Sequence, residues 1–240
     1  MDFDQNTYKS SSKPMTFRDY LTRVYSIVAV GVAISGVIAF FLGRNVYVLY
    51  SLMGDALFMF VLGACVLELA VGLFFSLKIS SMSKNTAWIC YILYSVLTGV
   101  SLSSLISVYT DASVFMAFFA TAVMFICMVI IGHTTRIDLS SISGLLFAGL
   151  IGILITGVVN IFLRSSMIDY VITVVGVLVF LGLTAYDMQK LRVFYENSQY
   201  DDELSEKAMV YGAFQLYLDF INLFIRILQL FGKRDDLCAC

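Results

Sequence analysis

The sequence predicts an all-α integral membrane protein built as a bundle of seven transmembrane helices. Of its 240 residues, 60% are hydrophobic and 13% are charged, and the mean hydropathy is +0.90. Soluble domains carry about 25% charged residues. The apolar residues gather in continuous runs, and about 20 such residues span the ~30 Å hydrocarbon core of a bilayer. Because the single proline, Pro14, precedes these runs, the predicted helices contain no proline kink.

Seven apolar runs have the length of a membrane span. They cover residues 24–42, 57–77, 86–109, 112–131, 141–163, 170–187 and 209–231. Open strands leave backbone groups unpaired in lipid, and barrel strands alternate in polarity, so these continuous runs are expected to be helices. Their short connections predict antiparallel neighbours in one bundle. We divide the chain into an N-terminal tail (1–23), a seven-helix domain (24–231) and a C-terminal tail (232–240).

The first two runs differ in what precedes them and in what they contain. Residues 1–23 are polar and have neither an apolar core nor a small-residue cleavage site, so the first run is expected to serve as an uncleaved insertion signal. The second run carries Glu68 near the bilayer midplane. The third run offers hydroxyl groups that are able to bond this acid, on Tyr91, Tyr94, Ser95, Thr98 and Ser101. Glu68 is therefore either a hydrogen-bonded packing acid or a step in an ion path.

The later runs become more polar toward the C-terminus. The fourth run ends beside His133, the only histidine, so no histidine pair is present to bind a metal. Glycines in the fifth run suit close helix packing. The sixth run ends at Asp187. The seventh is the least apolar, and we expect it to be either a polar, central helix of the bundle or a re-entrant segment.

The distribution of Lys and Arg predicts the orientation of the chain. The tail and the connections 78–85, 132–140 and 188–208 carry ten basic residues, whereas the opposite side carries four. Basic residues concentrate on the cytosolic side, so we expect a cytosolic N-terminus. Seven full spans place the C-terminus on the other side, whereas a re-entrant last run returns it to the cytosol; the composition leaves both open.

Four charged residues fall inside the predicted spans, namely Glu68, Asp187, Asp219 and Arg226. A charge near the centre of a spanning helix costs on the order of 2.5–3.5 kcal/mol on insertion scales, so each must face a partner, water or an ion. Asn222 and Arg226 follow Asp219 by three and seven positions, which predicts that these three residues share one helical face. Three of the four charges are acids, and this excess predicts a cation site within the bilayer.

The aspartate segments resemble a known family. Tyr186-Asp187 at the end of the sixth run, and Leu216–Phe224 (LYLDFINLF) in the seventh, are similar to the prokaryotic branch of the transmembrane Bax inhibitor motif family. Phe17–Tyr25 and Thr135–Ser140 are similar as well, so the resemblance extends over most of the chain. It implies a multi-pass protein of the bacterial inner membrane that acts as a proton-sensitive calcium leak.

The resemblance also implies that Asp187 and Asp219 form a hydrogen-bonded pair inside the bundle, and that their protonation is linked to opening of the second helix. Two carboxylates in contact at low dielectric cannot both ionise cheaply, so such a pair shares a proton and acts as a pH switch. Fully ionised, it offers calcium the oxygen ligands that this ion prefers. We therefore predict Asp187 and Asp219 as pH sensor and metal ligands, with Glu68 along the path.

In the family, an arginine at the cytosolic end of the second span can latch onto the aspartate pair, whereas this sequence has Lys78 there. We expect Lys78 or Arg226 to supply the competing positive charge, with Asn222 bonding the pair and Tyr186 beside it. A seventh helix starting at residue 208 would place Asp219 ~16 Å deep, far from Asp187. We therefore expect this helix to start near 211–214 and the sixth to continue past Asp187.

Other classes of function fit the sequence poorly. A net charge of −2 lacks the basic surface that nucleic acid requires. Aspartyl intramembrane proteases pair Tyr-Asp with Gly-x-Gly-Asp and a later proline element, which are absent here, so we expect no enzyme and no cofactor. The expected partners are the lipid bilayer, calcium and protons. The alternative function is a non-conducting regulator that binds membrane proteases or cell-death proteins.

Overall fold

The computed structural model describes residues 15–198 and 201–234, which fold into eight α-helices without a strand. Seven of these helices are long and apolar enough to cross a membrane, which confirms the predicted all-α, multi-pass architecture. The eight are α1 (Phe17–Arg44), α2 (Val46–Met53), α3 (Ala56–Lys78), α4 (Lys84–Ile106), α5 (Asp111–Thr134), α6 (Ser140–Leu163), α7 (Ser166–Ser198) and α8 (Asp202–Phe231).

Two helix boundaries at the start of the chain differ from the predicted runs. The first helix begins at Phe17 because Thr16 caps it, accepting a hydrogen bond from the Asp19 backbone N–H at 3.3 Å. The unpredicted α2 is apolar, but with eight residues it is too short to span the bilayer. It ends at Gly54, whose φ of 55° is in the region that favours glycine.

The last two helices are the longest, with 33 and 30 residues. As expected, α7 continues past Asp187, reaching Ser198. The expected late start of α8 is wrong, because the helix begins at Asp202. Asp201 provides the reason, since its side chain caps the helix by accepting a hydrogen bond from the Leu204 N–H at 3.0 Å.

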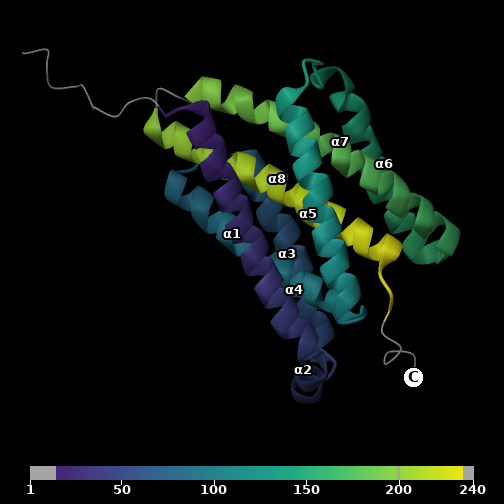
Figure 1. Cartoon of the computed structure of the whole chain (residues 1–240). Coiled ribbons are helices and arrows are strands. Elements are labelled where there is room, and N and C mark those ends of the chain that lie inside the picture. Colours follow the sequence, from purple (N-terminus) through teal and green to yellow (C-terminus); the bar gives the residue numbers. More distant parts are fainter. Residues whose placement is uncertain (1–14, 199–200, 235–240) are drawn as a thin grey trace, which may run out of the picture.

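The helix α8 runs through the bundle and packs against α1, α4, α5 and α7 (Figure 1). Two thirds of its most apolar window, 67%, is buried, the largest share among the seven spans. By contrast, α3 packs mainly against α4, and α6 mainly against α7. In each of these two helices, only 6% of the most apolar window is buried by the rest of the protein. Their outer faces are therefore the ones that meet lipid.

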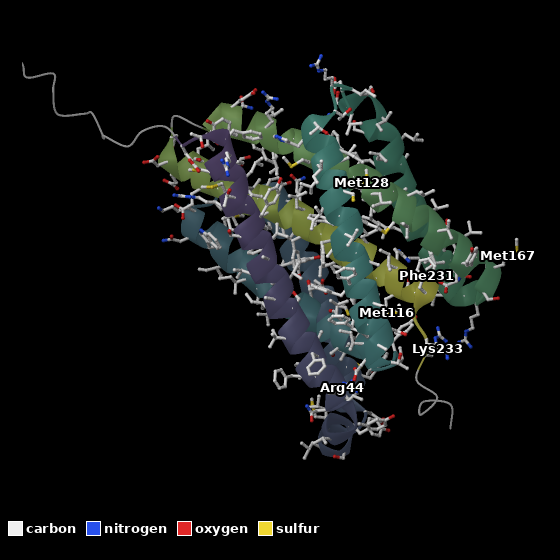
Figure 2. All side chains as sticks on the ribbon, viewed as in Figure 1. Arg44, Met116, Met128, Met167, Phe231 and Lys233 are labelled. Carbon is white, nitrogen blue, oxygen red and sulfur yellow. The ribbon has the colours of Figure 1, made fainter. Side chains whose placement is uncertain are left out.

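Hydrogen bonds at its two ends show that α8 crosses the whole bundle. Near its start, Glu206 accepts hydrogen bonds from Lys84 Nζ at 3.0 Å and Trp88 Nε1 at 3.2 Å, at the beginning of α4. Beyond its end, the Lys233 N–H donates to Ser113 Oγ at 2.8 Å, just after α4 has ended. Figure 2 shows Lys233 toward the same end of the bundle as Arg44. The re-entrant alternative is therefore wrong, and Lys233 lies on the face opposite the start of α1.

Glycine permits the closest helix contact between α5 and α7. A Cβ atom on Gly132 would overlap the backbone of Ala185 and lie 2.9 Å from Met188 Cβ. Backbone atoms cannot move aside as a side chain can. The two helices therefore require glycine at this position.

We expect Gly132→Ala to lower the free energy of unfolding by about 1–3 kcal/mol, the usual cost of overpacking. The matched control is Gly152→Ala on α6, where a Cβ meets nothing within 4 Å. The control should be as stable as the parent or slightly more stable, because Ala favours helix. Thermal unfolding in detergent measures both variants, and equal stability of the two would contradict the close contact.

Candidate functional site

The two intramembrane aspartates lie on neighbouring helices and are both buried. Asp187 of α7 is 8% exposed and Asp219 of α8 is 4% exposed. One carboxylate oxygen of each, Oδ1 of Asp187 and Oδ2 of Asp219, has no hydrogen-bond partner among the described residues. A buried polar atom without a partner is costly. A proton, a water molecule or a cation is therefore needed to satisfy these oxygens.

The packing of α7 on α8 brings these aspartates close together. Gly212 of α8 lies against Leu191, and Gly176 of α7 lies against Arg226. In the antiparallel register that these contacts set, Asp219 lies opposite Thr184, three residues or ~4.5 Å of helical rise from Asp187. The two carboxyl groups interact electrostatically. The structure thus places the two aspartates on facing sides of α7 and α8, but no hydrogen bond joins their carboxyl groups in the described part of the chain. The hydrogen-bonded pair that the resemblance implies stays a prediction.

Helices α1 and α5 close the site from the other side. Met188, the residue after Asp187, accepts a hydrogen bond at its Sδ from the Tyr25 hydroxyl of α1 at 3.2 Å. Gly132 of α5 lies against Ala185 and Met188. Both helices therefore contact α7 within two residues of Asp187, and the carboxyl group has little access to the surrounding lipid.

The positive charge nearest the aspartates comes from Lys190, which the sequence analysis did not select. Lys190 follows Asp187 by three residues on the same face of α7, and its charge acts on both carboxyl groups. Its Nζ lies 5.4 Å from the centre of the Phe194 ring. The expected latch residue, Lys78, is the last residue of α3 and is exposed. The spacing of three between Asp187 and Lys190 is the sequence signal that could have identified this pair.

Arg226 lies at the other end of the contact between α7 and α8. Its side chain packs against Gly176, its Nη1 donates to Gln229 Oε1 at 3.1 Å, and the charge of Asp169 acts on it. Arg226 does face α7, as Asp219 does. It lies seven residues or ~10 Å along α8 from that aspartate, however, so its nearest acid is Asp169.

Two of the supporting residues face away from the aspartates. Asn222 lines a cavity beside Glu68, and its Nδ2 donates to the Leu218 carbonyl at 2.8 Å. The expectation that it shares a face with Asp219 is therefore wrong. The Tyr186 ring packs edge-on against Phe147 of α6, with centroids 6.1 Å apart. Tyr186 thus anchors α6 to α7.

Glu68 forms a second polar site, between α3 and α4. Its two carboxylate oxygens each accept a hydrogen bond of 2.7 Å, one from Thr98 and one from Ser101. The adjoining cavity has a volume of about 200 Å³ and is also lined by Tyr94 and Asn222. These are hydroxyl groups of the third predicted run, as the sequence analysis expects for a packing acid. The cavity beside Glu68 is also compatible with the alternative interpretation, in which this acid is a step in an ion path.

A buried polar cluster that the sequence did not reveal joins α8 to α1 and α4. The Tyr217 hydroxyl lies 2.5 Å from Ser35 Oγ, which donates to the Ser95 carbonyl at 2.7 Å. Ser35 stands within an apolar run, where a lone serine gives no signal of its role. This cluster and the Glu68 cavity both adjoin α8, so one helix contacts every buried polar site described above.

Gln189, two residues after Asp187, forms hydrogen bonds with the connection between α5 and α6. Gln189 Nε2 donates to the Ile137 carbonyl at 2.8 Å, and its Oε1 accepts from the Leu139 N–H at 3.0 Å. In the same connection, hydrogen bonds from Ser140 hold the pKa of Asp138 below its ordinary value. Asp138 is therefore an exposed, ionised carboxylate outside the spans.

The ligands available for a metal ion are few. Calcium takes six to eight oxygens, and no group of three or more His, Cys, Asp or Glu side chains comes together in the described part of the chain. Two aspartates with water molecules would bind calcium weakly. Weak binding is what an ion needs in order to leave a site as readily as it enters.

Comparisons with known proteins find one family model and several bacterial relatives that match most of the chain. A family model described as "Inhibitor of apoptosis-promoting Bax1" matches residues 17–236. The chain is 38% identical to the inner membrane protein YbhL of Escherichia coli K12, over 90% of this chain and 92% of YbhL. It is 36% identical to the uncharacterised protein RP147 of Rickettsia prowazekii, over 96% and 98% of the two chains. An uncharacterised protein of Borreliella burgdorferi is 35% identical, over 90% and 93%.

We expect Glu68→Ala to lower the free energy of unfolding by about 1–3 kcal/mol, because Thr98 and Ser101 lose their buried acceptor. Leu69→Ala is the matched control on the same helix, since Leu69 is 68% exposed. Its effect should be about 0.5 kcal/mol or less. Thermal unfolding in detergent compares the two, and an unchanged Glu68→Ala variant would show that the hydrogen bonds contribute nothing to stability.

Proposed function

The chain belongs to the Bax inhibitor family of multi-pass membrane proteins, and from this we propose that it is a pH-sensitive calcium leak channel. The observation that carries the proposal is the pair of buried aspartates, Asp187 and Asp219, each with a carboxylate oxygen that lacks a hydrogen-bond partner in the described chain. Carboxylates inside a membrane bundle mark ion and proton paths.

The proposed mechanism is competition between protons and calcium for the same oxygens. When both carboxyl groups are ionised, they repel each other and attract a divalent cation, which supplies the positive charge that the site lacks. When they share a proton, the charge and the affinity for calcium both fall. Lys190 offsets part of the negative charge from one turn away, so the site holds calcium loosely.

The helix that we propose as the gate is α3. It packs mainly against α4, whereas the other face of the α7–α8 pair is held by α1 and α5. A helix with few buried contacts moves at low cost. Glu68 lies on this helix beside a cavity that reaches Asn222 of α8. Displacement of α3 would enlarge this cavity toward α8, which makes Glu68 a step on the proposed path.

Calcium release from loaded vesicles, measured between pH 6 and 8, tests the proposal. We expect the parent to release calcium faster as the pH rises, because ionisation creates the cation site. Asp187→Asn and Asp219→Asn should each slow release at pH 8 by about tenfold, which corresponds to ~1.4 kcal/mol, and should flatten the pH dependence. Asp138→Asn is the matched control, because this aspartate is exposed outside the spans.

Two results would overturn the conduction proposal. One is release from vesicles with protein that equals release from empty vesicles. The other is behaviour of the two aspartate variants that matches the parent at every pH. The first result would favour the non-conducting regulator, since that function needs no ion path. The second result would show that Asp187 and Asp219 are not part of the path.

Lys190→Gln tests whether Lys190 balances the aspartates. Removal of its positive charge favours the protonated site, so the midpoint of the pH profile of calcium release should move to higher pH. We expect a change on the order of half a pH unit, or ~0.7 kcal/mol. Lys78→Gln is the matched control and should leave the midpoint in place. If the midpoint moved further in the Lys78→Gln variant than in the Lys190→Gln variant, Lys78 on α3 would be the residue that balances the aspartates, as the family resemblance implies.

A further inference from the structure

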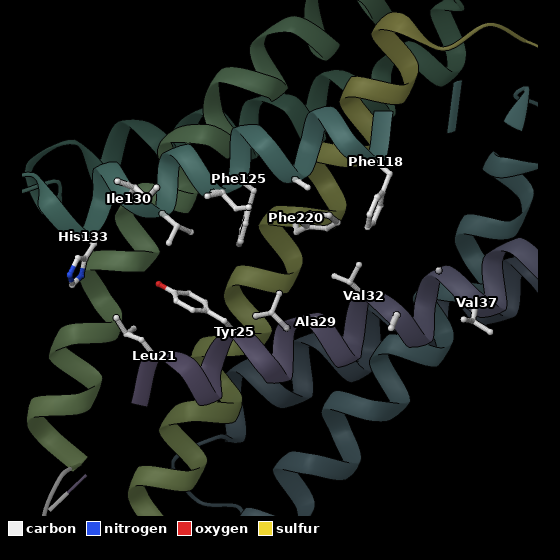
Figure 3. Close-up of a pocket in the computed structure, with 16 residues that line it drawn as sticks. Leu21, Tyr25, Ala29, Val32, Val37, Phe118, Phe125, Ile130, His133 and Phe220 are labelled. Atoms are coloured by element: carbon white, nitrogen blue, oxygen red, sulfur yellow. The ribbon is translucent and has the colours of Figure 1, made fainter. Parts of the chain in front are cut away.

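An apolar groove of about 940 Å³ separates α1 from α5. Figure 3 shows side chains of the two helices facing each other across it, with Phe220 of α8 between them. Its lining is apolar except for the Tyr25 hydroxyl and the His133 ring, which lies at one end. A path for ions needs polar groups along its length, so this groove is not a second route for calcium.

The groove runs along most of both helices. A second cavity of about 390 Å³ shares Val32, Gly36, Phe118 and Phe220 with it and continues toward Asp111. The stretch of α1 from Leu21 to Val37 alone spans ~24 Å at 1.5 Å per residue, against a hydrocarbon thickness of ~30 Å. A Cβ atom added at Gly36 would meet nothing within 4 Å, so the groove is open where the two cavities meet.

Contacts between α1 and α5 close the groove at both ends. At one end, the rings of Phe17 and His133 stack with centroids 5.9 Å apart. At the other end, Arg44 forms an ion pair with Asp111. An α-helix with side chains is ~10–12 Å wide and would need to pass both ends in order to cross the bilayer beside this protein. The closed ends therefore exclude a spanning helix of a second copy and admit a thinner occupant.

The end at Phe17 and His133 carries two arginines, Arg18 and Arg192, and one acid, Asp19, which accepts a hydrogen bond from the Thr16 hydroxyl at 2.7 Å. Arg18 precedes Leu21 and Tyr25 by three and seven residues, so it lies on the groove face of α1. Within the described chain, no ion pair joins Arg18 to an acid. The Arg192 guanidinium lies 5.9 Å from the centre of the Phe17 ring, and Arg192 also pairs with Glu196. The start of α1 adds the positive end of a helix dipole.

We propose that the groove is a binding site for an anionic glycerophospholipid from the leaflet on the side of the α1 N-terminus. One acyl chain fills the apolar length between α1 and α5. The mouth of the site is the lipid-facing side of the closed end at Phe17 and His133, where the acyl chain enters sideways from the bilayer. The phosphate lies there next to Arg18, where a helix N-terminus and a guanidinium both favour an anion. The acyl chain supplies the apolar contacts that the groove lining otherwise lacks.

The bound chain would touch the helix that carries Asp219. Phe220, the next residue, lines the groove and packs edge-on against Phe118 and Phe125, with centroids 5.6 and 5.5 Å apart. Lipid in the groove would hold these three rings in place. The site is nevertheless defined by binding alone and does not depend on calcium passage.

Retention of lipid by the purified protein tests the proposal. The protein is extracted in detergent, mixed with equal amounts of phosphatidylglycerol and phosphatidylcholine, and examined by native mass spectrometry. We expect the parent to retain one phosphatidylglycerol several-fold more often than phosphatidylcholine. Ala122→Phe, which fills the groove from α5, should reduce retention about tenfold. Val123→Phe is the matched control, because Val123 is exposed but does not line the groove.

A second pair of variants tests the mouth and guards against misfolding. Arg18→Gln should abolish the preference for phosphatidylglycerol, while Arg23→Gln, which lies off the groove face, should keep it. If Ala122→Phe unfolds at a lower temperature than the parent, Ala33→Phe fills the groove from α1 instead. The proposal is overturned if the filled and control variants retain lipid equally, if the parent shows no headgroup preference, or if filling the groove changes only dimer formation.

Discussion

The constraint on which the rest of this structure depends is the burial of two carboxyl groups within a bilayer-spanning bundle. An isolated ionised carboxylate in an apolar interior is strongly unfavourable, so the surrounding helices must supply charge, hydrogen bonds or a shared proton. Asp187 and Asp219 occupy the longest helix pair, where Gly176 and Gly212 allow α7 and α8 to approach closely. Because α7 continues past Asp187 to Ser198, the carboxyl group of Asp187 and the charge of Lys190 lie on the same helix within the bundle.

The central helix α8 distributes its polar groups over different faces. Asp219 faces α7, Tyr217 reaches Ser35 of α1, and Asn222 lines the cavity beside Glu68 of α3. Each group therefore meets a different neighbour, and rotation of α8 changes all three contacts at once. In the proposed mechanism, this arrangement would couple a proton at one face of α8 to packing at another face, provided that a neighbouring helix is free to move. The loosely packed α3 satisfies that condition.

Most of the fold follows from hydrophobicity, since each of the seven apolar runs forms a span. That Asp187 and Asp219 need partners follows from their place inside spans, whereas their pairing with each other was implied by the family resemblance. Other features depend on local geometry that composition does not reveal. The start of α8 depends on capping by Asp201, and the placement of Asn222 depends on a rotation of a few tens of degrees about the helix axis. The influence of Lys190 was not predicted because this residue follows the predicted sixth run and falls in the predicted connection 188–208.

The central place of α8 has a consequence for how the protein is made. This helix is the last of the seven spans to leave the ribosome, yet it packs against four of the others. Until it inserts, Tyr91 and Tyr94 of α4 lack the aromatic partners Phe214 and Tyr217, which they later meet edge-on. The helices α1 and α3 pack against α4 without α8, but the tertiary structure is complete only when α8 inserts. Before that insertion, the helices that later surround α8 lack their shared neighbour.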